Sequence, residues 1–158
     1  MKTLATFILG LMTLTGCNCQ KAVTEKENIT SQEIMKQQTI PVLEYEAFTR
    51  GFYQKITVTD QKVSVVTTRN GKAVVTPISD KDWEELQSLY ATVDKEGLAT
   101  LESPTQKRFY DGAPIANLRV IDGDKIYESA AFDGGFPPQA IEKIVNKLIE
   151  VADNIKEQ

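Results

Sequence analysis

Residues 52–66 read Phe-Tyr-Gln-Lys-Ile-Thr-Val-Thr-Asp-Gln-Lys-Val-Ser-Val-Val, and this stretch decides the fold class. Its first half places Phe52, Ile56 and Val58 on one side and mostly polar side chains on the other, which predicts a strand buried on one face. Asp60-Gln61 then turns the chain, and the alternation resumes. Two strands joined by so short a turn are antiparallel neighbours.

The same pattern continues on both sides of this hairpin. Four further stretches are predicted strands: Val42 to Thr49, Ala73 to Thr76, Ile115 to Ile121, and Lys125 to Phe132. Asn70-Gly71 and Asp122-Gly123 each precede one of them and are typical of tight β-hairpin turns. The simplest arrangement of such strands is an antiparallel meander.

Two amphipathic helices are predicted as well. Ser79, followed by Asp82 three residues later, is a helix start, and Gly97 ends that segment. Its apolar residues recur at helical spacing: Trp83, Leu86, Leu89, Tyr90 and Val93. Pro138 opens a second helix with the same periodicity: Ile141, Ile144, Val145, Leu148, Ile149, Ala152 and Ile155. The sequence therefore predicts an α+β domain, an antiparallel sheet of about five to six strands with both helices packed on one face.

Composition narrows the classes of function. The chain has 158 residues, with 18 Lys and Arg against 22 Asp and Glu, and no His. A mildly acidic chain without a basic cluster argues against nucleic acid binding, which depends on neutralising phosphates. The lack of His removes the commonest proton-transfer group and zinc ligand, and no Gly-x-Ser-x-Gly motif is present. We therefore expect no catalytic residues, no metal and no cofactor.

The N-terminus has the order of an export signal. Met1-Lys2 supplies a positive start, and Leu4 to Leu14 is an uncharged apolar stretch too short to span a bilayer. Leu14-Thr15-Gly16-Cys17 follows, and it resembles the lipobox of bacterial lipoproteins. The resemblance implies cleavage between Gly16 and Cys17, a diacylglyceryl group on the Cys17 thiol, and fatty acid such as palmitate at the new terminus. The alternative is an ordinary secretory signal that ends near a cysteine.

The lipobox divides the chain into a signal peptide (1–16), a polar tether (17–40) and a single domain (41–158). After cleavage the charge is 17 − 22 = −5. Residues 18–21 lack the acidic run that marks surface export in some bacteria. We therefore expect a protein of a diderm envelope, held by lipid in the outer membrane and facing the periplasm, with the cell surface as the alternative. The second cysteine, Cys19, has no predicted role.

One loop combines the residue types that are common at protein contacts. Within Glu102 to Pro114 it contains Lys107, Arg108, Phe109 and Tyr110, two cations beside two aromatic residues. These four are the candidate contact with a partner. The alternative is that Phe109 or Tyr110 packs into the core. Arg50-Gly51-Phe52-Tyr53 has a similar composition, but we expect it to belong to the sheet.

Two segments contain residues that suggest a ligand-binding site. Asp122-Gly123-Asp124, with Asp111 and Asp133, suggests a cation site but lacks the spacing of a calcium loop, so a hairpin turn is favoured. Asp133-Gly134-Gly135-Phe136-Pro137-Pro138 precedes a helix, where backbone N–H groups can hold a phosphate. Its two prolines remove two of those donors, so we expect a loop whose Phe136 packs against the helix.

These observations favour a lipid-anchored, non-enzymatic binding or scaffold domain whose partner is another envelope protein. Two alternatives stay open. Phe48-Thr49-Arg50-Gly51-Phe52 and Asn117 to Leu148 are similar in course to emfourin-like inhibitors of metalloproteases, although Arg50-Gly51 replaces their double glycine. That resemblance implies an envelope protease inhibitor and assigns no inhibitory residue. The other alternative is a carboxylate-dependent envelope enzyme, which requires a cleft holding two carboxyl groups about 5 to 10 Å apart.

Overall fold

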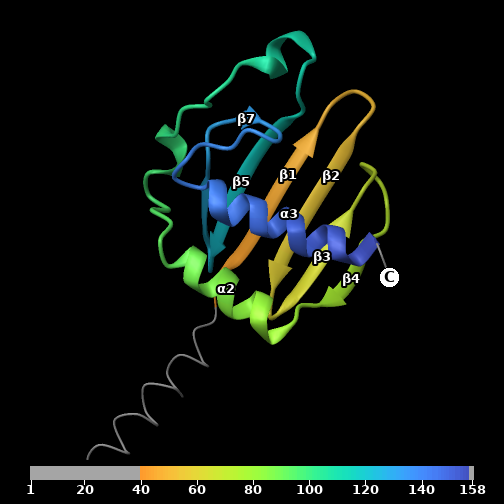
Figure 1. Cartoon of the computed structure of the whole chain (residues 1–158), viewed down its shortest axis with the longest axis vertical. Helices are drawn as coiled ribbons and strands as arrows, with labels where there is room; N and C mark the ends of the chain where they lie inside the picture. The colour runs from red at the N-terminus through yellow and green to blue at the C-terminus, as the bar shows by residue number, and fades with distance from the viewer. Residues whose placement is uncertain (1–39, 157–158) are drawn as a thin grey trace, which may run out of the picture. The chain divides into compact units, whose positions relative to one another are not determined.

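A seven-stranded antiparallel sheet forms one layer of the domain, in a computed structural model that describes residues 40–156 (Figure 1). Its strands are β1 (Val42–Phe48), β2 (Tyr53–Thr59), β3 (Lys62–Val66), β4 (Val74–Pro77), β5 (Ile115–Asp122), β6 (Lys125–Glu128) and β7 (Phe132–Asp133). The order is β4-β3-β2-β1-β5-β6, and β7 pairs with the first residues of β5. The first and fifth strands therefore lie side by side at the centre.

The second layer is helical and covers one face of the sheet. Its helices are α2 (Asp80–Tyr90) and α3 (Glu142–Lys156), with short 3-10 turns η1 (Leu98–Thr100) and η2 (Lys107–Tyr110). The Ser79 side chain accepts a hydrogen bond from the N–H of Asp82 and caps α2, as the sequence predicts. No helix within 40–156 has the length and apolar character needed to cross a bilayer.

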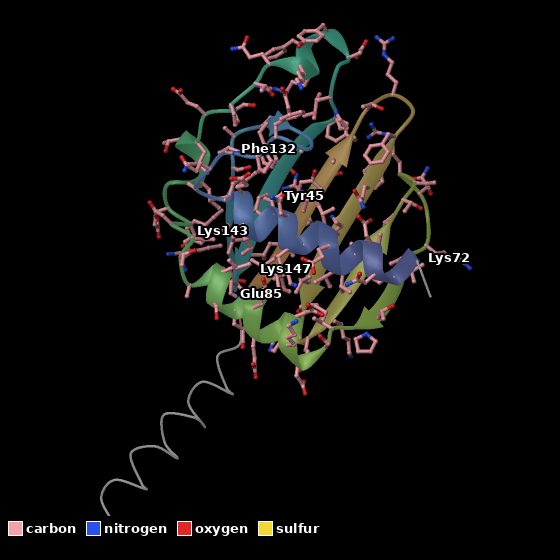
Figure 2. The ribbon with its side chains drawn as sticks, viewed as in Figure 1. Tyr45, Lys72, Glu85, Phe132, Lys143 and Lys147 are labelled. Carbon is pink, nitrogen blue, oxygen red and sulfur yellow. The ribbon has the colours of Figure 1, made fainter. Side chains whose placement is uncertain are left out.

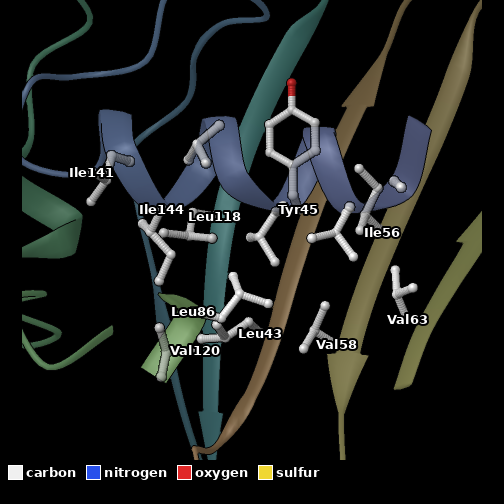
Figure 3. Packing of buried hydrophobic residues seen from close by; sticks show 14 of the residues in the cluster. Leu43, Tyr45, Ile56, Val58, Val63, Leu86, Leu118, Val120, Ile141 and Ile144 are labelled. Atoms are coloured by element: carbon white, nitrogen blue, oxygen red, sulfur yellow. The ribbon is translucent and has the colours of Figure 1, made fainter. Parts of the chain in front are cut away.

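The core lies between α3 and the sheet (Figure 3). Alternate residues of β1, Leu43, Tyr45 and Ala47, are at most 2% exposed because they face this layer. Leu118 and Val120 of β5 continue the same surface, and the buried face of α3 closes it. The burial of Tyr45 raises the pKa of its hydroxyl to about 12.

A buried cation joins the two helices. Lys147 of α3 is only 5% exposed, and its Nζ lies 2.8 Å from carboxylate oxygens of both Asp82 and Glu85 on α2 and 3.1 Å from Glu150 (Figure 2). Burial alone would lower the pKa of Lys147, but the hydrogen bonds to these carboxylates raise it. The ammonium group therefore stays charged inside the helical layer and fixes α3 against α2.

The predicted fold class is confirmed: an antiparallel sheet with two helices on one face. The strand total is higher than predicted because Lys125 to Phe132 is not continuous. The chain leaves β5 after Glu128, where the Ser129 hydroxyl accepts the N–H of Leu118 and the N–H of Ala130 bonds to η1 instead. Phe132 then returns to β5 as β7, beside Ala116.

Three boundaries differ from the sequence-based predictions. Phe52 precedes β2 and is 45% exposed, because the Thr49 side chain and N–H tie residues 51 and 52 into a turn. Helix α2 ends at Tyr90, and Val93, the last residue of the predicted apolar spacing, packs against the core from the turn that follows. Helix α3 begins at Glu142, since the chain first makes a turn in which Ile141 donates to the Pro138 carbonyl. The predictions for 1–39, including Gly16, Cys17 and Cys19, lie outside the described residues.

Candidate functional site

Exposed aromatic side chains gather at one end of the sheet. Among the large apolar side chains that the described region exposes, four are aromatic: Phe52, Phe109, Tyr110 and Phe136. Phe52 lies in the β1–β2 turn, and the other three lie in the loops next to the start of β5. Register places these loops together, because Phe48 pairs with both Tyr53 and Ile115. We call these four side chains the aromatic end.

The aromatic end lies opposite the point where the described chain begins. Strand β1 runs from Val42, two residues after Ile40, to Phe48 at the aromatic end. Figure 1 shows the loop that contains η2 projecting past the sheet on the same side as the β1–β2 turn. Phe109 and Tyr110, at the tip of this loop, are 72% and 71% exposed. The alternative in which either ring packs into the core is therefore wrong.

The backbone of the loop accounts for the exposure of both rings. Residues 107–110 form the 3-10 turn η2, which ends at Asp111 with a φ of 60°. Asp is one of the few residue types that adopt this left-handed conformation readily. The next residue, Gly112, donates to the Lys107 carbonyl, and a Cβ there would lie 2.8 Å from the Tyr110 ring. Gly112 therefore leaves the space that the Tyr110 side chain occupies.

A buried carboxylate holds the turn in place. Asp133 of β7 is fully buried, and its oxygens accept hydrogen bonds from the Thr105 hydroxyl and from the backbone N–H groups of Lys107, at 2.6 Å, and Arg108, at 3.1 Å. The Arg108 guanidinium adds an ion pair at 2.9 Å. Beyond the turn, Gly134 donates to the Pro114 carbonyl. Both ends of the projecting loop are therefore tied to the β7 segment.

The pKa of Asp133 reports the strength of this arrangement. Burial alone would raise that pKa, because it removes water from the charged form. The hydrogen bonds from Thr105, Arg108 and the two backbone N–H groups outweigh burial and lower the pKa from 3.8 to about 2. Asp133 therefore stays ionised near neutral pH, and its hydrogen bonds fix the loop.

The four residues of the predicted partner contact have different surroundings. Arg108 points inward: its guanidinium bonds to Asp133, to Ser103 Oγ and to the Thr105 carbonyl, and its side chain is only 14% exposed. The Arg108 guanidinium therefore holds the loop, and a contact between Arg108 and a partner stays a prediction. Lys107 Nζ lies 3.7 Å from the centre of the Phe136 ring. Only Phe109 and Tyr110 present most of their side chains to solvent.

Phe136, which the sequence predicts to pack against the helix, has a second contact that the sequence does not indicate. Its ring is 40% exposed and carries Lys107 on its face. A tight turn in which Phe136 donates to the Asp133 carbonyl sets this position. The sequence indicated Asp133 only as a possible cation ligand and Phe136 only as a loop residue, because the partners that they contact lie about 25 to 30 residues earlier in the chain.

The β1–β2 turn adds a second group of aromatic and cationic residues. The Arg69 guanidinium lies 5.0 Å from the Phe48 ring centre and 5.6 Å from that of Tyr53, and it donates to the Thr49 carbonyl. Tyr53 belongs to β2, as expected, but Arg50 and Phe52 are exposed in the turn. Arg50-Gly51-Phe52-Tyr53 is therefore only partly in the sheet.

The charge at this end is opposite in sign to that of the whole chain. Residues 49–52, 105–112 and 133–136, together with Arg69, contain four cations and two carboxylates, a local charge of 4 − 2 = +2, whereas the chain is at −4. The cations are Arg50, Arg69, Lys107 and Arg108, and the carboxylates are Asp111 and Asp133. Arg108 and Asp133 neutralise each other. The charges that remain are the exposed cations Arg50 and Arg69, stacked Lys107, and one exposed carboxylate, Asp111.

Carboxylates also converge on the face of the sheet that the helices leave open. Arg119 of β5 lies 2.7 Å from Glu44, 3.6 Å from Glu46 and 3.2 Å from Glu128, and Lys55 lies 2.7 Å from Glu44. Every one of these carboxylates is therefore ion-paired across neighbouring strands. The cluster extends across β6, β5, β1 and β2, and such cross-strand pairs stabilise an open face.

A hollow of about 460 Å³ lies beside the N-terminus of α2 and the C-terminal part of α3. Asp82 is its only lining carboxylate, and this group already accepts hydrogen bonds from Ser79 and Lys147. The hollow does not bring together the two carboxyl groups that a glycan-cleaving site requires.

The two segments for which the sequence suggested a ligand, residues 122–124 and 133–138, lie at opposite ends of β5. Asp122-Gly123-Asp124 forms the β5–β6 hairpin with Gly123 at a φ of 59°, as favoured, at the end of β5 opposite to Asp133. Within residues 40–156 no three Cys, Asp or Glu side chains are grouped to hold a metal ion. The N-terminal residues of α3 follow the turn at 138–141 and are separated from the Gly134-Gly135 backbone.

Comparisons with known proteins add no relative: no protein family, no curated protein and no solved structure matches the chain.

Proposed function

We propose that this chain is a lipid-anchored protein of the bacterial envelope whose domain acts by binding through its aromatic end. In this proposal the signal peptide is removed, Cys17 carries the lipid, and the domain works from the outer membrane, facing the periplasm. The observation that carries the binding role is the exposure of Phe109 and Tyr110 on a turn whose backbone is held by hydrogen bonds. Two large rings in solvent are costly for an isolated soluble domain, and aromatic side chains are enriched at sites of contact.

Pre-organisation supports the same conclusion. A flexible loop loses conformational freedom when it binds, and that loss weakens affinity. Here the Asp133 carboxylate and the Gly134–Pro114 hydrogen bond already fix the loop. The aromatic end can therefore bind without first ordering its backbone. An envelope protein is the partner that the sequence favours, and this stays a prediction.

Site-specific photocrosslinking in intact cells tests the proposal. A photoreactive phenylalanine analogue replaces Phe109 in one strain and Ile126 in another. Ile126 is a matched control because it is 64% exposed and lies in β6, at the other end of β5. We expect a defined adduct from position 109 that position 126 does not give. Equal adducts from both positions, or none from 109, would contradict binding through the aromatic end.

A protease inhibitor of the emfourin type is the second candidate. The feature that favours it is again the η2 turn, because a rigid projecting loop can enter a protease cleft with little loss of entropy. Incubation of the purified protein with a thermolysin-type protease tests it. Inhibition that Phe109→Ser weakens supports this candidate, whereas unchanged proteolysis at a large molar excess removes it.

A further inference from the structure

We propose that the aromatic end docks on an anionic lipid surface, so that the protein meets the membrane at two points, its lipid and this loop. The inference rests on the proposed function, since it names what the aromatic end contacts. Three features favour this contact: the shape of the aromatic end, its charge, and the length of chain between the domain and Cys17.

The shape of the aromatic end favours contact with a broad, deformable surface over binding of a small ligand. Sites for small ligands are concave, but Phe109 and Tyr110 stand on a projecting turn with more than two thirds of each side chain in solvent. Aromatic rings displayed in this way bury themselves at the boundary between lipid headgroups and acyl chains. Phe52 and Phe136, at the same end, widen the apolar contact.

Charge favours an anionic surface and sets the orientation. Arg50 lies in the β1–β2 turn with Phe52, exposed Arg69 donates to the Thr49 carbonyl of that turn, and Lys107 stacks on Phe136, while the chain as a whole is acidic. Each Lys or Arg near an anionic bilayer adds a favourable contribution that decays within a Debye length. The rest of the acidic domain is repelled by such a bilayer. The aromatic end is therefore the part that turns toward it.

Chain length permits both contacts on one bilayer. Between Cys17 and Thr39 there are 39 − 17 = 22 peptide units, which span at most about 75 Å when fully extended. The seven residues of β1 cover about 23 Å. The far end of the sheet can therefore reach the membrane that holds the lipid. Once the lipid is inserted, the second contact is intramolecular, so a weak affinity is sufficient.

Vesicle binding by the mature chain without its lipid tests the inference. Residues 17–158 with Cys17→Ser are mixed with vesicles of phosphatidylglycerol and phosphatidylcholine (1:1) or of phosphatidylcholine alone, at low salt, and bound protein is measured by sedimentation. We expect binding to the anionic vesicles that is at least several-fold stronger than to the neutral ones. The double variant Phe109→Ser/Tyr110→Ser should bind at least tenfold more weakly. The control Val75→Ser/Ile126→Ser, which removes two other apolar side chains that are more than half exposed, in β4 and β6, should bind like the parent.

Fluorescence provides a second, independent measurement. Phe109→Trp should show a blue-shifted emission when anionic vesicles are added, and Ile126→Trp should not. Both variants are expected to fold, since each changes a side chain that is largely in solvent. Lys107→Gln should weaken binding to the anionic vesicles and reduce its dependence on salt.

Three results would overturn the inference. They are no binding to anionic vesicles, equal binding by the parent and the double serine variant, and a crosslink from position 109 in cells that reaches protein only. The last of these leaves the proposed function intact, because it identifies a protein groove as the occupant. Loss of acylation at Cys17 would instead contradict the anchor and leave the vesicle results unchanged.

Discussion

Asp133 and Lys147 are both buried charges held by hydrogen bonds, but they stabilise different parts of the domain. Lys147 joins two helices, and its carboxylate partners on α2 and α3 are 24% to 60% exposed. Asp133 joins a two-residue strand to a projecting loop, and its donors are backbone N–H groups and a mostly buried guanidinium. Lys147 supports the packing of the fold, whereas Asp133 supports the display of the aromatic end. The two sites should therefore respond differently to mutation.

The largest effect is expected from Asp133→Asn. The substitution keeps the shape of the side chain but leaves the Arg108 charge without its partner in a mostly buried position. Breaking such a pair should lower the free energy of unfolding by about 3 kcal/mol. Urea denaturation measures this change, and the exposed Asp124→Asn is the control. A loss no larger than that of the control would show that Asp133 does not hold the loop.

Acid should produce the next largest effect. A carboxyl group whose pKa is lower in the folded state than in the unfolded state stabilises the fold above its unfolded pKa, and this stabilisation is lost as pH falls toward the folded pKa. For Asp133 the interval runs from 3.8 down to about 2, which corresponds to about 2 kcal/mol. The difference in stability between the parent and Asp133→Asn should therefore shrink by that amount between pH 5 and pH 2, as read from urea midpoints. A constant difference would contradict the lowered pKa.

Lys147→Met should lower the free energy of unfolding by less, about 1 kcal/mol. The methionine side chain fills the same space, and Asp82, Glu85 and Glu150 can turn their carboxylates to water because they are partly exposed. Thermal unfolding compared with the exposed Lys143→Met measures the change. If Lys147→Met destabilises the domain more than Asp133→Asn does, the contrast between the two sites is wrong.

Phe109→Ser should have the smallest effect on stability, within about 0.5 kcal/mol, because the ring contributes little to the packed core. The same variant should lose the contact made by the aromatic end. A large drop in the unfolding midpoint would show that the ring is structural and would remove the basis for the binding proposal.

Local patterns in the sequence predicted most of the fold. Period-two alternation located the strands at 42–66 and 115–121, and the Ser79 cap and the apolar spacing of α3 located the helices. Patterns of this kind act over a few residues, so one sequence contains them. The pairing of β1 with β5 joins segments about 70 residues apart, and no local signal specifies it.

The candidate site was only partly predictable for the same reason. The composition of 107–110 indicated a contact surface, but it did not distinguish Arg108, which points inward, from Phe109, which points outward. That difference depends on Asp133, whose hydrogen-bond partners lie 25 to 28 residues away in the chain. Phe136 joins the aromatic end through Lys107, across a similar separation. Contacts at this range become visible only when the chain is folded.

The proposal that the domain works from a lipid anchor has one direct test, the mass of the N-terminal peptide of the protein isolated from its own cell envelope. Cleavage before Cys17 followed by acylation predicts a peptide that begins at residue 17 and carries a diacylglyceryl group. A peptide that begins at Met1, or one that begins at residue 17 without fatty acid, would contradict the anchor.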